Sequence, residues 1–180
     1  MATFGRTVPD GCSGGGDFQG YIFMWRVQLT EAGLLTAMGI YLSNSGSGSN
    51  VRLGVFADNA GEPAALVAQT GDVSVPNMAA GWVGDDFQSS YNAAAGYYWQ
   101  ALNTYYTGAS TISFWCTDAT GTEREKSVSD SAFPNPAGSG WSSYTAEFCT
   151  YVTYTPTAGG LLWKPSAPDG GLFKRMNGGY

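Results

Sequence analysis

The sequence predicts an all-β fold, an antiparallel β-sandwich of about eight strands. Short segments alternate apolar and polar residues with a period of two, which is typical of strands that bury one face. Turns rich in Gly, Pro, Asn and Ser separate these segments. No window of about ten residues shows the period of an amphipathic helix, which excludes α/β enzyme folds.

The 180 residues, 43% of them hydrophobic, are enough for one domain with a single core. We expect an N-terminal Gly-rich arm over residues 1–20, a sandwich over 21–156 and an extended C-terminal tail over 157–180. The arm contains three consecutive glycines at 14–16 and few apolar residues. It is therefore expected to lie on a surface rather than to form a core.

The first strand is predicted over residues 21–29, where aromatic and β-branched residues alternate with polar ones. A second follows over 34–42, after a connection at 31–33. Residues 43–50 are Ser, Gly and Asn in large part, which predicts a loop.

The stretch from 51 to 102 has the clearest strand pattern in the chain. Val51, Leu53 and Val55 alternate with polar or small residues and predict a half-buried strand. Residues 58–63, DNAGEP, are suited to a turn. An apolar run at 64–68 and a strand at 96–102 follow, so the whole stretch is interpreted as a β-meander.

The last third of the sandwich is less regular. A short strand is predicted at 111–116, and the charged segment 118–130 is interpreted as a solvated hairpin. Two prolines fix a long loop at 133–140. Residues 147–155 alternate again, and Pro156 closes this last core strand.

Three stretches of the sequence also resemble a known family of β-sandwich modules. The series VRLGVFADNAGEPAALVA, then Gly81-Trp82, then AGYYWQAL resembles jelly-roll β-sandwich modules of bacteriophage virion structural proteins and of bacterial secreted or surface proteins. The resemblance covers roughly residues 21–154 and implies a jelly-roll fold. Such sandwiches decorate virions, bind glycans or space other domains, so the resemblance implies no single function.

Charge and composition exclude several classes of function. The net charge of −6 and only eight Lys and Arg residues argue against nucleic-acid binding. No run approaches the roughly 18 apolar residues of a membrane span. The N-terminus shows no secretory signal, which predicts synthesis in a host cytoplasm.

The chain contains no histidine, so Ser-His-Asp and Cys-His catalytic sites and His-based metal sites are excluded. We predict a protein that is not an enzyme, with no catalytic residue and no cofactor. Glycoside hydrolysis needs only two carboxylates. The candidates for that alternative are Asp85, Asp86, Glu123, Glu125 and Glu147, although neighbouring Asp85 and Asp86 should point to opposite faces of a strand.

The possible calcium ligands and the three cysteines can be explained without a metal site. Asp58, Asn59 and Asp118 offer oxygen ligands, but turn formation explains the first two equally well. The spacing of Cys12, Cys116 and Cys149 does not fit a zinc site. Cys116 and Cys149 are expected to be buried free thiols, with a disulfide between them as the alternative, and Cys12 to be a loop thiol that is free or cross-linked.

The tail carries two similar apolar and basic segments, 161–164 and 172–175. Exposing their large side chains would cost on the order of 1.5–3 kcal/mol each, so they need a groove, either on their own sandwich or on a neighbouring subunit. Lys164, Lys174 and Arg175 against Asp169 give the tail +2 and leave −8 for the rest, which favours an acidic acceptor. The predicted assembly residues are Leu161, Leu162, Trp163, Lys164, Leu172, Phe173, Lys174 and Arg175.

These observations predict a non-enzymatic structural protein of a bacteriophage virion, a capsid decoration or a fibre or appendage subunit. Its expected partners are copies of itself, with a trimer as one arrangement, and other virion proteins. The alternative is a carbohydrate-binding or receptor-binding module, and the third hypothesis is an extracellular filament subunit.

In the carbohydrate-binding alternative, a glycan would stack on aromatic residues in or beside the loops. The residues predicted for that platform are Trp82, Tyr91, Tyr105, Tyr106 and Trp141.

Overall fold

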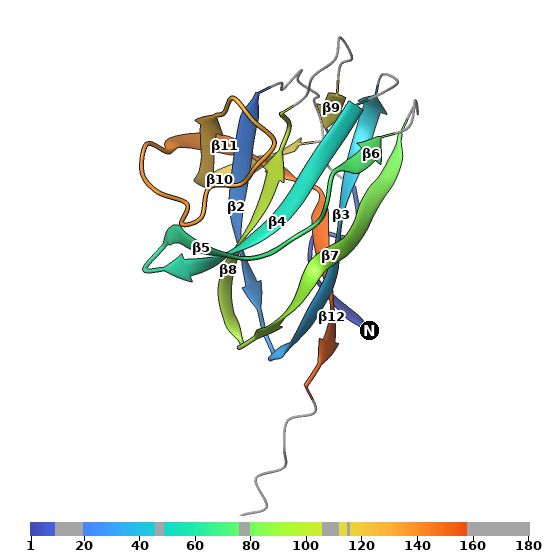
Figure 1. The fold of residues 1–180 in the computed structure, drawn as a ribbon, viewed down its shortest axis with the longest axis vertical. Coiled ribbons are helices and arrows are strands. Elements are labelled where there is room, and N and C mark those ends of the chain that lie inside the picture. Colours follow the sequence, from blue (N-terminus) through green and yellow to red (C-terminus); the bar gives the residue numbers. More distant parts are fainter. Residues whose placement is uncertain (10–19, 46–48, 76–79, 106–111, 115, 158–180) are drawn as a thin grey trace, which may run out of the picture.

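The computed structural model describes residues 1–9, 20–45, 49–75, 80–105, 112–114 and 116–157 (Figure 1). These residues form strands, turns and loops, all strand pairs are antiparallel, and the described part contains no helix. The strands are β1 (Ala2–Gly5), β2 (Tyr21–Leu29), β3 (Gly33–Ser45), β4 (Ser49–Asn59), β5 (Glu62–Gln69), β6 (Val73–Val75), β7 (Gly81–Ala93), β8 (Gly96–Asn103), β9 (Ile112–Phe114), β10 (Cys116–Ser127), β11 (Ser142–Phe148) and β12 (Thr150–Pro156).

Two sheets form the sandwich. A five-stranded sheet has the order β1-β12-β3-β7, with β9 beside β3, and a seven-stranded sheet has the order β11-β10-β2-β8-β4-β5, with β6 beside β4. Eight of these strands pair as β1·β12, β2·β8, β3·β7 and β4·β5. When these eight strands are numbered along the chain, strand one pairs with eight, two with seven, three with six and four with five. This is the jelly-roll connectivity. The predicted all-β jelly-roll sandwich is confirmed.

Several predicted elements are wrong in detail. Residues 2–5 do not belong to a surface arm, because β1 pairs with β12 and buries Phe4. The sandwich therefore begins at Ala2. The stretch 51–102 is not a meander, since β7 lies in the other sheet from β4, β5 and β8. The segment 118–130 is not a solvated hairpin, because most of it is β10, a strand between β2 and β11.

The main core fills the space between the two sheets. Inward-facing residues of both sheets meet there, among them Trp25 and Leu53 from the seven-stranded sheet and Leu35, Ile40 and Val152 from the five-stranded sheet. All five side chains are buried. Buried and less buried residues alternate along β12, as the period-two sequence pattern requires, whereas β2 and β8 contain continuous buried runs.

A buried polar network crosses this core. The Trp25 indole N–H donates to Gln100 Oε1 and Thr150 Oγ1, and the Thr150 hydroxyl donates to the same Gln100 oxygen. The Gln100 amide group donates in turn to the backbone carbonyl of Phe4 at 3.1 Å. One glutamine therefore joins β8 to β1 and β12 of the opposite sheet, and it satisfies polar groups that would otherwise be buried without partners.

The outer faces of the two sheets differ. The chain after β10, the orange loop beside β10 and β11 in Figure 1, places Phe133 and Ala137 in a second apolar cluster with Phe56 and Trp99. This loop covers part of the outer face of the seven-stranded sheet. Phe133 fits closely because a Cβ on Gly54 would lie only 2.8 Å from its ring.

Candidate functional site

Outward-facing residues of β3, β7 and β12 form the candidate site on the five-stranded sheet. In β3, Met38, Ile40 and Leu42 are buried in the core, so the intervening Gly39 and Tyr41 lie on the outer face. The register sets Tyr41 opposite Trp82 of β7, and Gly39 lies between Gly84 of β7 and Tyr151 of β12. Three neighbouring strands thus bring three large aromatic side chains together.

Tyr41, Trp82 and Tyr151 form what we name the aromatic cluster. The ring centroids of Tyr41 and Trp82 lie 5.4 Å apart at an interplanar angle of 71°, and those of Trp82 and Tyr151 lie 4.9 Å apart at 61°. Both contacts are edge-to-face, an arrangement favoured by the ring quadrupoles. All three side chains are half-buried, so the cluster is fixed by packing and still open to solvent.

Two glycines make room beside these rings. A Cβ on Gly39 would lie 2.9 Å from the Tyr151 ring, so a larger residue would displace the tyrosine. A Cβ on Gly84 would lie 2.8 Å from the Cα of Gly39 and would collide with the Met38 carbonyl oxygen. The absence of both Cβ atoms keeps the sheet surface low between Trp82 and Tyr151.

The result is a groove of about 390 Å³ on the open face of the sheet. Asp85 and Asp86 line it and are both exposed, and the Asp86 backbone N–H donates to Asp85 Oδ1 at 2.8 Å. Asp86 pairs with Ala37 on the outer face, whereas Asp85 pairs with the core-facing Met38, so the two side chains leave β7 in opposite directions, as predicted. The residues that line the groove are Ala37, Met38, Trp82, Val83, Gly84, Asp85, Asp86, Tyr151 and Thr153.

The other predicted platform residues do not join Trp82. Tyr91 packs against the main core, and Trp141 lies under Lys126 with its indole N–H donated to the Gly138 carbonyl. Tyr105 lines a separate notch, and Tyr106 lies outside the described residues. Of the four described residues of the predicted platform, only Trp82 lines the groove.

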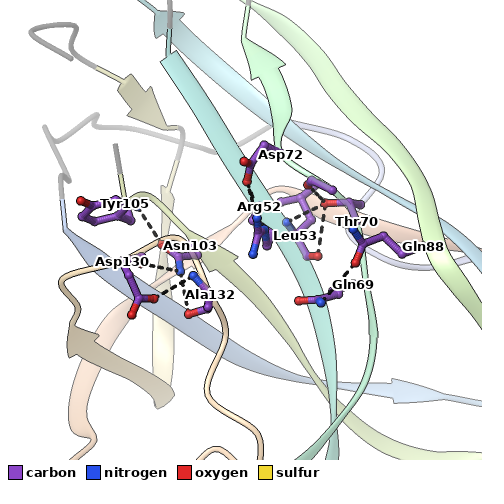
Figure 2. Close-up of polar contacts among 11 residues, drawn as sticks. Arg52, Leu53, Gln69, Thr70, Asp72, Gln88, Asn103, Tyr105, Asp130 and Ala132 are labelled. Atoms are coloured by element: carbon purple, nitrogen blue, oxygen red, sulfur yellow. Dashed lines mark hydrogen bonds and ion pairs between the residues drawn. The ribbon is translucent and has the colours of Figure 1, made fainter. Parts of the chain in front are cut away.

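The notch at Tyr105 is small and polar, with a volume of about 90 Å³. Figure 2 shows the Arg52–Asp72 ion pair on one side and Asn103 with Tyr105 on the other. The Asn103 side-chain oxygen accepts from the Tyr105 backbone N–H at 2.7 Å, and its amide group donates to the carbonyls of Asp130 and Ala132. These contacts hold the loop after β10 in place, which is a structural role.

Sequence comparisons give this site no precedent. No family model matches the chain, and no curated protein sequence is similar to it.

The predicted carboxylate candidates are split between the sheets. Glu123 and Glu125 lie on β10 of the seven-stranded sheet, whereas Asp85 and Asp86 lie on β7 of the other. The Glu147 side chain lies outside the described residues. No acidic pair from the two sheets therefore meets across the groove.

Asp58 has a structural role at the turn between β4 and β5. Its carboxylate accepts from the Arg26 guanidinium at 2.7 and 3.0 Å, from the Trp99 indole N–H and from the Gly61 backbone N–H. The Arg26 hydrogen bonds are the main cause that lowers the pKa of Asp58 below its ordinary value. These donors occupy both oxygens, while Asn59 is exposed and the Asp118 side chain lies outside the described residues. Within the described residues, no cluster of three or more acidic or cysteine side chains is arranged to hold a metal ion.

Cys149 is fully buried, as predicted. The disulfide to Cys116 stays an untested alternative. Cys12 and the Cys116 side chain lie outside the described residues, as do all eight predicted assembly residues of the tail. Among the described residues, no helix is long and apolar enough to cross a membrane.

Two residues of the aromatic cluster were missed by sequence reasoning, Tyr41 and Tyr151. Each lies in a segment correctly predicted to be a strand, and each occupies the phase that alternation assigns to the outer face. The alternation of inward and outward residues was therefore the sequence signal that could have identified both tyrosines. An outward-facing tyrosine flanked by buried neighbours, as Tyr151 is by Thr150 and Val152, points to a binding surface rather than to the core.

Proposed function

We propose that the protein is a non-catalytic carbohydrate-binding module that holds a saccharide chain in the groove. The observation that carries this proposal is the aromatic cluster beside two exposed carboxylates on an open sheet face. Aromatic rings stack on the apolar faces of sugar rings, and carboxylate oxygens accept hydrogen bonds from sugar hydroxyls. The groove volume falls within the usual range of ligand sites, about 300–1,000 Å³.

The ring geometry favours a single saccharide chain over a flat polysaccharide surface. Neighbouring rings of the cluster are inclined by 61° and 71°, so they form walls and not one plane. A flat crystalline surface needs coplanar rings at matching heights. An isolated chain can place one sugar against Trp82 and let its neighbours contact Tyr151 or the carboxylates.

The test is isothermal titration calorimetry with a panel of neutral oligosaccharides. Trp82→Ala and Tyr151→Ala should each weaken binding at least about fivefold, because a ring contact worth about 1 kcal/mol is lost. Trp141→Ala is the matched control and should bind like the wild type, because Trp141 packs beside Lys126 outside the groove. The proposal fails if no oligosaccharide binds or if Trp82→Ala binds as well as the wild type.

A role as an assembled virion subunit is the second candidate. The charge of the tail and its position in the chain support this role. The basic tail follows β12, and Tyr151 and Thr153 of β12 line the acidic groove. The Thr157 backbone N–H still donates to the Ala32 carbonyl, so the tail starts from a fixed point on the sandwich. A fibre or decoration subunit that binds a glycan on a cell surface would combine both candidates.

Removing residues 159–180 tests this second role. The full chain should form an oligomer and the shortened chain a folded monomer, as measured by light scattering with circular dichroism as the control for folding. Equal masses for the two proteins would show that the tail does not drive assembly.

A further inference from the structure

We infer that the groove selects a cationic amino-sugar chain, an oligosaccharide of protonated glucosamine units, over neutral and anionic chains. This inference rests on the proposed function and names its ligand class. It is carried by the charges around the aromatic cluster.

The groove is acidic, and its lining residues include no Lys or Arg. Asp85 and Asp86 are exposed, and no ion pair within the described residues involves either of them. The Asp86 backbone N–H donates to Asp85 Oδ1. The Asp86 carboxylate has the phase of the outer face and is available to a ligand in the groove, and Asp85 adds a second negative charge at this edge of the sheet.

The described cations lie elsewhere. Arg26, Arg52 and Arg124 belong to β2, β4 and β10 of the seven-stranded sheet, where each pairs with an acidic residue. Lys126 lies over the Trp141 ring on the same sheet, and Arg6 follows β1 and donates to the Val8 carbonyl. Among the described residues, none supplies a positive charge that would balance Asp85 and Asp86, and a cationic ligand would supply it.

A protonated glucosamine chain matches both chemical features of the groove. One ammonium group pairs with Asp86, while Asp85 adds to the attraction from the sheet edge. Other ammonium groups are attracted to the faces of Trp82 and the tyrosines by cation–π interaction. Its ring faces supply the apolar contact that the aromatic cluster offers. A uronic acid chain presents the same ring faces but is repelled by Asp85 and Asp86.

The experiment compares two hexasaccharides that share length and linkage, one of glucosamine and one of N-acetylglucosamine. Calorimetry is performed at low ionic strength and at mildly acidic pH, where the amine is protonated. The glucosamine hexamer should bind about two- to fivefold more tightly, as one exposed ion pair with a second charge nearby allows. Raising the salt concentration should reduce this preference.

Two double variants locate the effect. Asp85→Asn with Asp86→Asn should bring the affinity ratio of the two hexamers close to one. Glu62→Gln with Asp72→Asn makes the same change in net charge on the other sheet and should keep the preference. A preference lost in both variants would mean that only the net charge of the protein matters, which overturns the inference.

The remaining outcomes separate this inference from the proposed function. Equal affinity of the wild type for both hexamers, or an unchanged ratio in the Asp85→Asn, Asp86→Asn protein, overturns the amino-sugar preference alone. If no member of the wider panel binds, the carbohydrate function fails as well. In that case, a synthetic peptide of residues 159–180 is titrated into the protein that lacks these residues. Binding that is lost in the Trp82→Ala variant of this shortened protein would show that the groove holds the tail.

Discussion

Gly39 and Gly84 face each other on β3 and β7, and they shape the groove in different ways. The space that a Cβ on Gly39 would need is occupied by the far end of the Tyr151 side chain, which can rotate away. The space at Gly84 is occupied by backbone atoms of Met38 and Gly39, which cannot move without separating the strands. The same substitution should therefore damage binding at one position and stability at the other.

Gly39→Ala should reduce oligosaccharide affinity severalfold with little change in melting temperature, because Tyr151 is displaced while the backbone stays in place. Gly84→Ala should lower the free energy of unfolding by about 1–3 kcal/mol, the usual cost of forcing extra volume into a packed site. Calorimetric titration and urea unfolding of both variants check this contrast. Two variants with the same profile would contradict it.

At the level of single residues, the sequence indicated only part of the site. Trp82 was predicted as a glycan contact, as one of the aromatic residues in or beside loops. Its partners come from positions 41 and 151, about 40 and 70 residues away along the chain. Only the strand register, which depends on long-range pairing, brings Tyr41 and Tyr151 to Trp82.

Strand β1 is the shortest of the eight core strands and depends on contacts from the opposite sheet. It has four residues and pairs with β12 on one side only. Gln100 of β8 reaches across the core to the Phe4 carbonyl, and the Arg6 backbone N–H donates to the Thr150 carbonyl. The polar network therefore positions β1 in addition to the burial of Phe4.

Gln100→Met should destabilise the protein by about 1–3 kcal/mol, because the Phe4 carbonyl and the Thr150 hydroxyl lose a buried partner that methionine cannot replace. Urea unfolding measures the loss. Gln88→Met on the exposed part of β7 is the matched control and should change stability by less than about 0.5 kcal/mol. A Gln100→Met protein as stable as this control would show that the network adds nothing to β1.

Elements with strong alternation were predictable and the others were not. The limits of β2 were predicted to the residue, and β4, β8 and β12 were found within a few residues. β7 was missed because Gly, Asp, Gln and Ser dominate a strand whose residues are mostly exposed. β10 was misread because its charges suggested a solvated hairpin, yet Glu123 is buried between β2 and β11.

At the scale of the whole molecule, the fold class was predictable and the division into sheets was not. Turn residues and period-two patterns are local properties, so they identify strands and antiparallel connections. They carry no information on which strand pairs with which. The sequence therefore suggested a meander between 51 and 102, where the chain in fact crosses from one sheet to the other and back.

The jelly-roll connectivity also has a consequence for the order of events during synthesis. β12 is the last of the eight core strands to leave the ribosome, yet it lies inside its sheet, between β1 and β3. Until it docks, β1 has no neighbour in that sheet and Trp82 lacks Tyr151. Pairing between distant strands is intrinsically slow. The candidate site is therefore completed only after β12 has paired, and a nascent chain that stops before residue 150 lacks Tyr151.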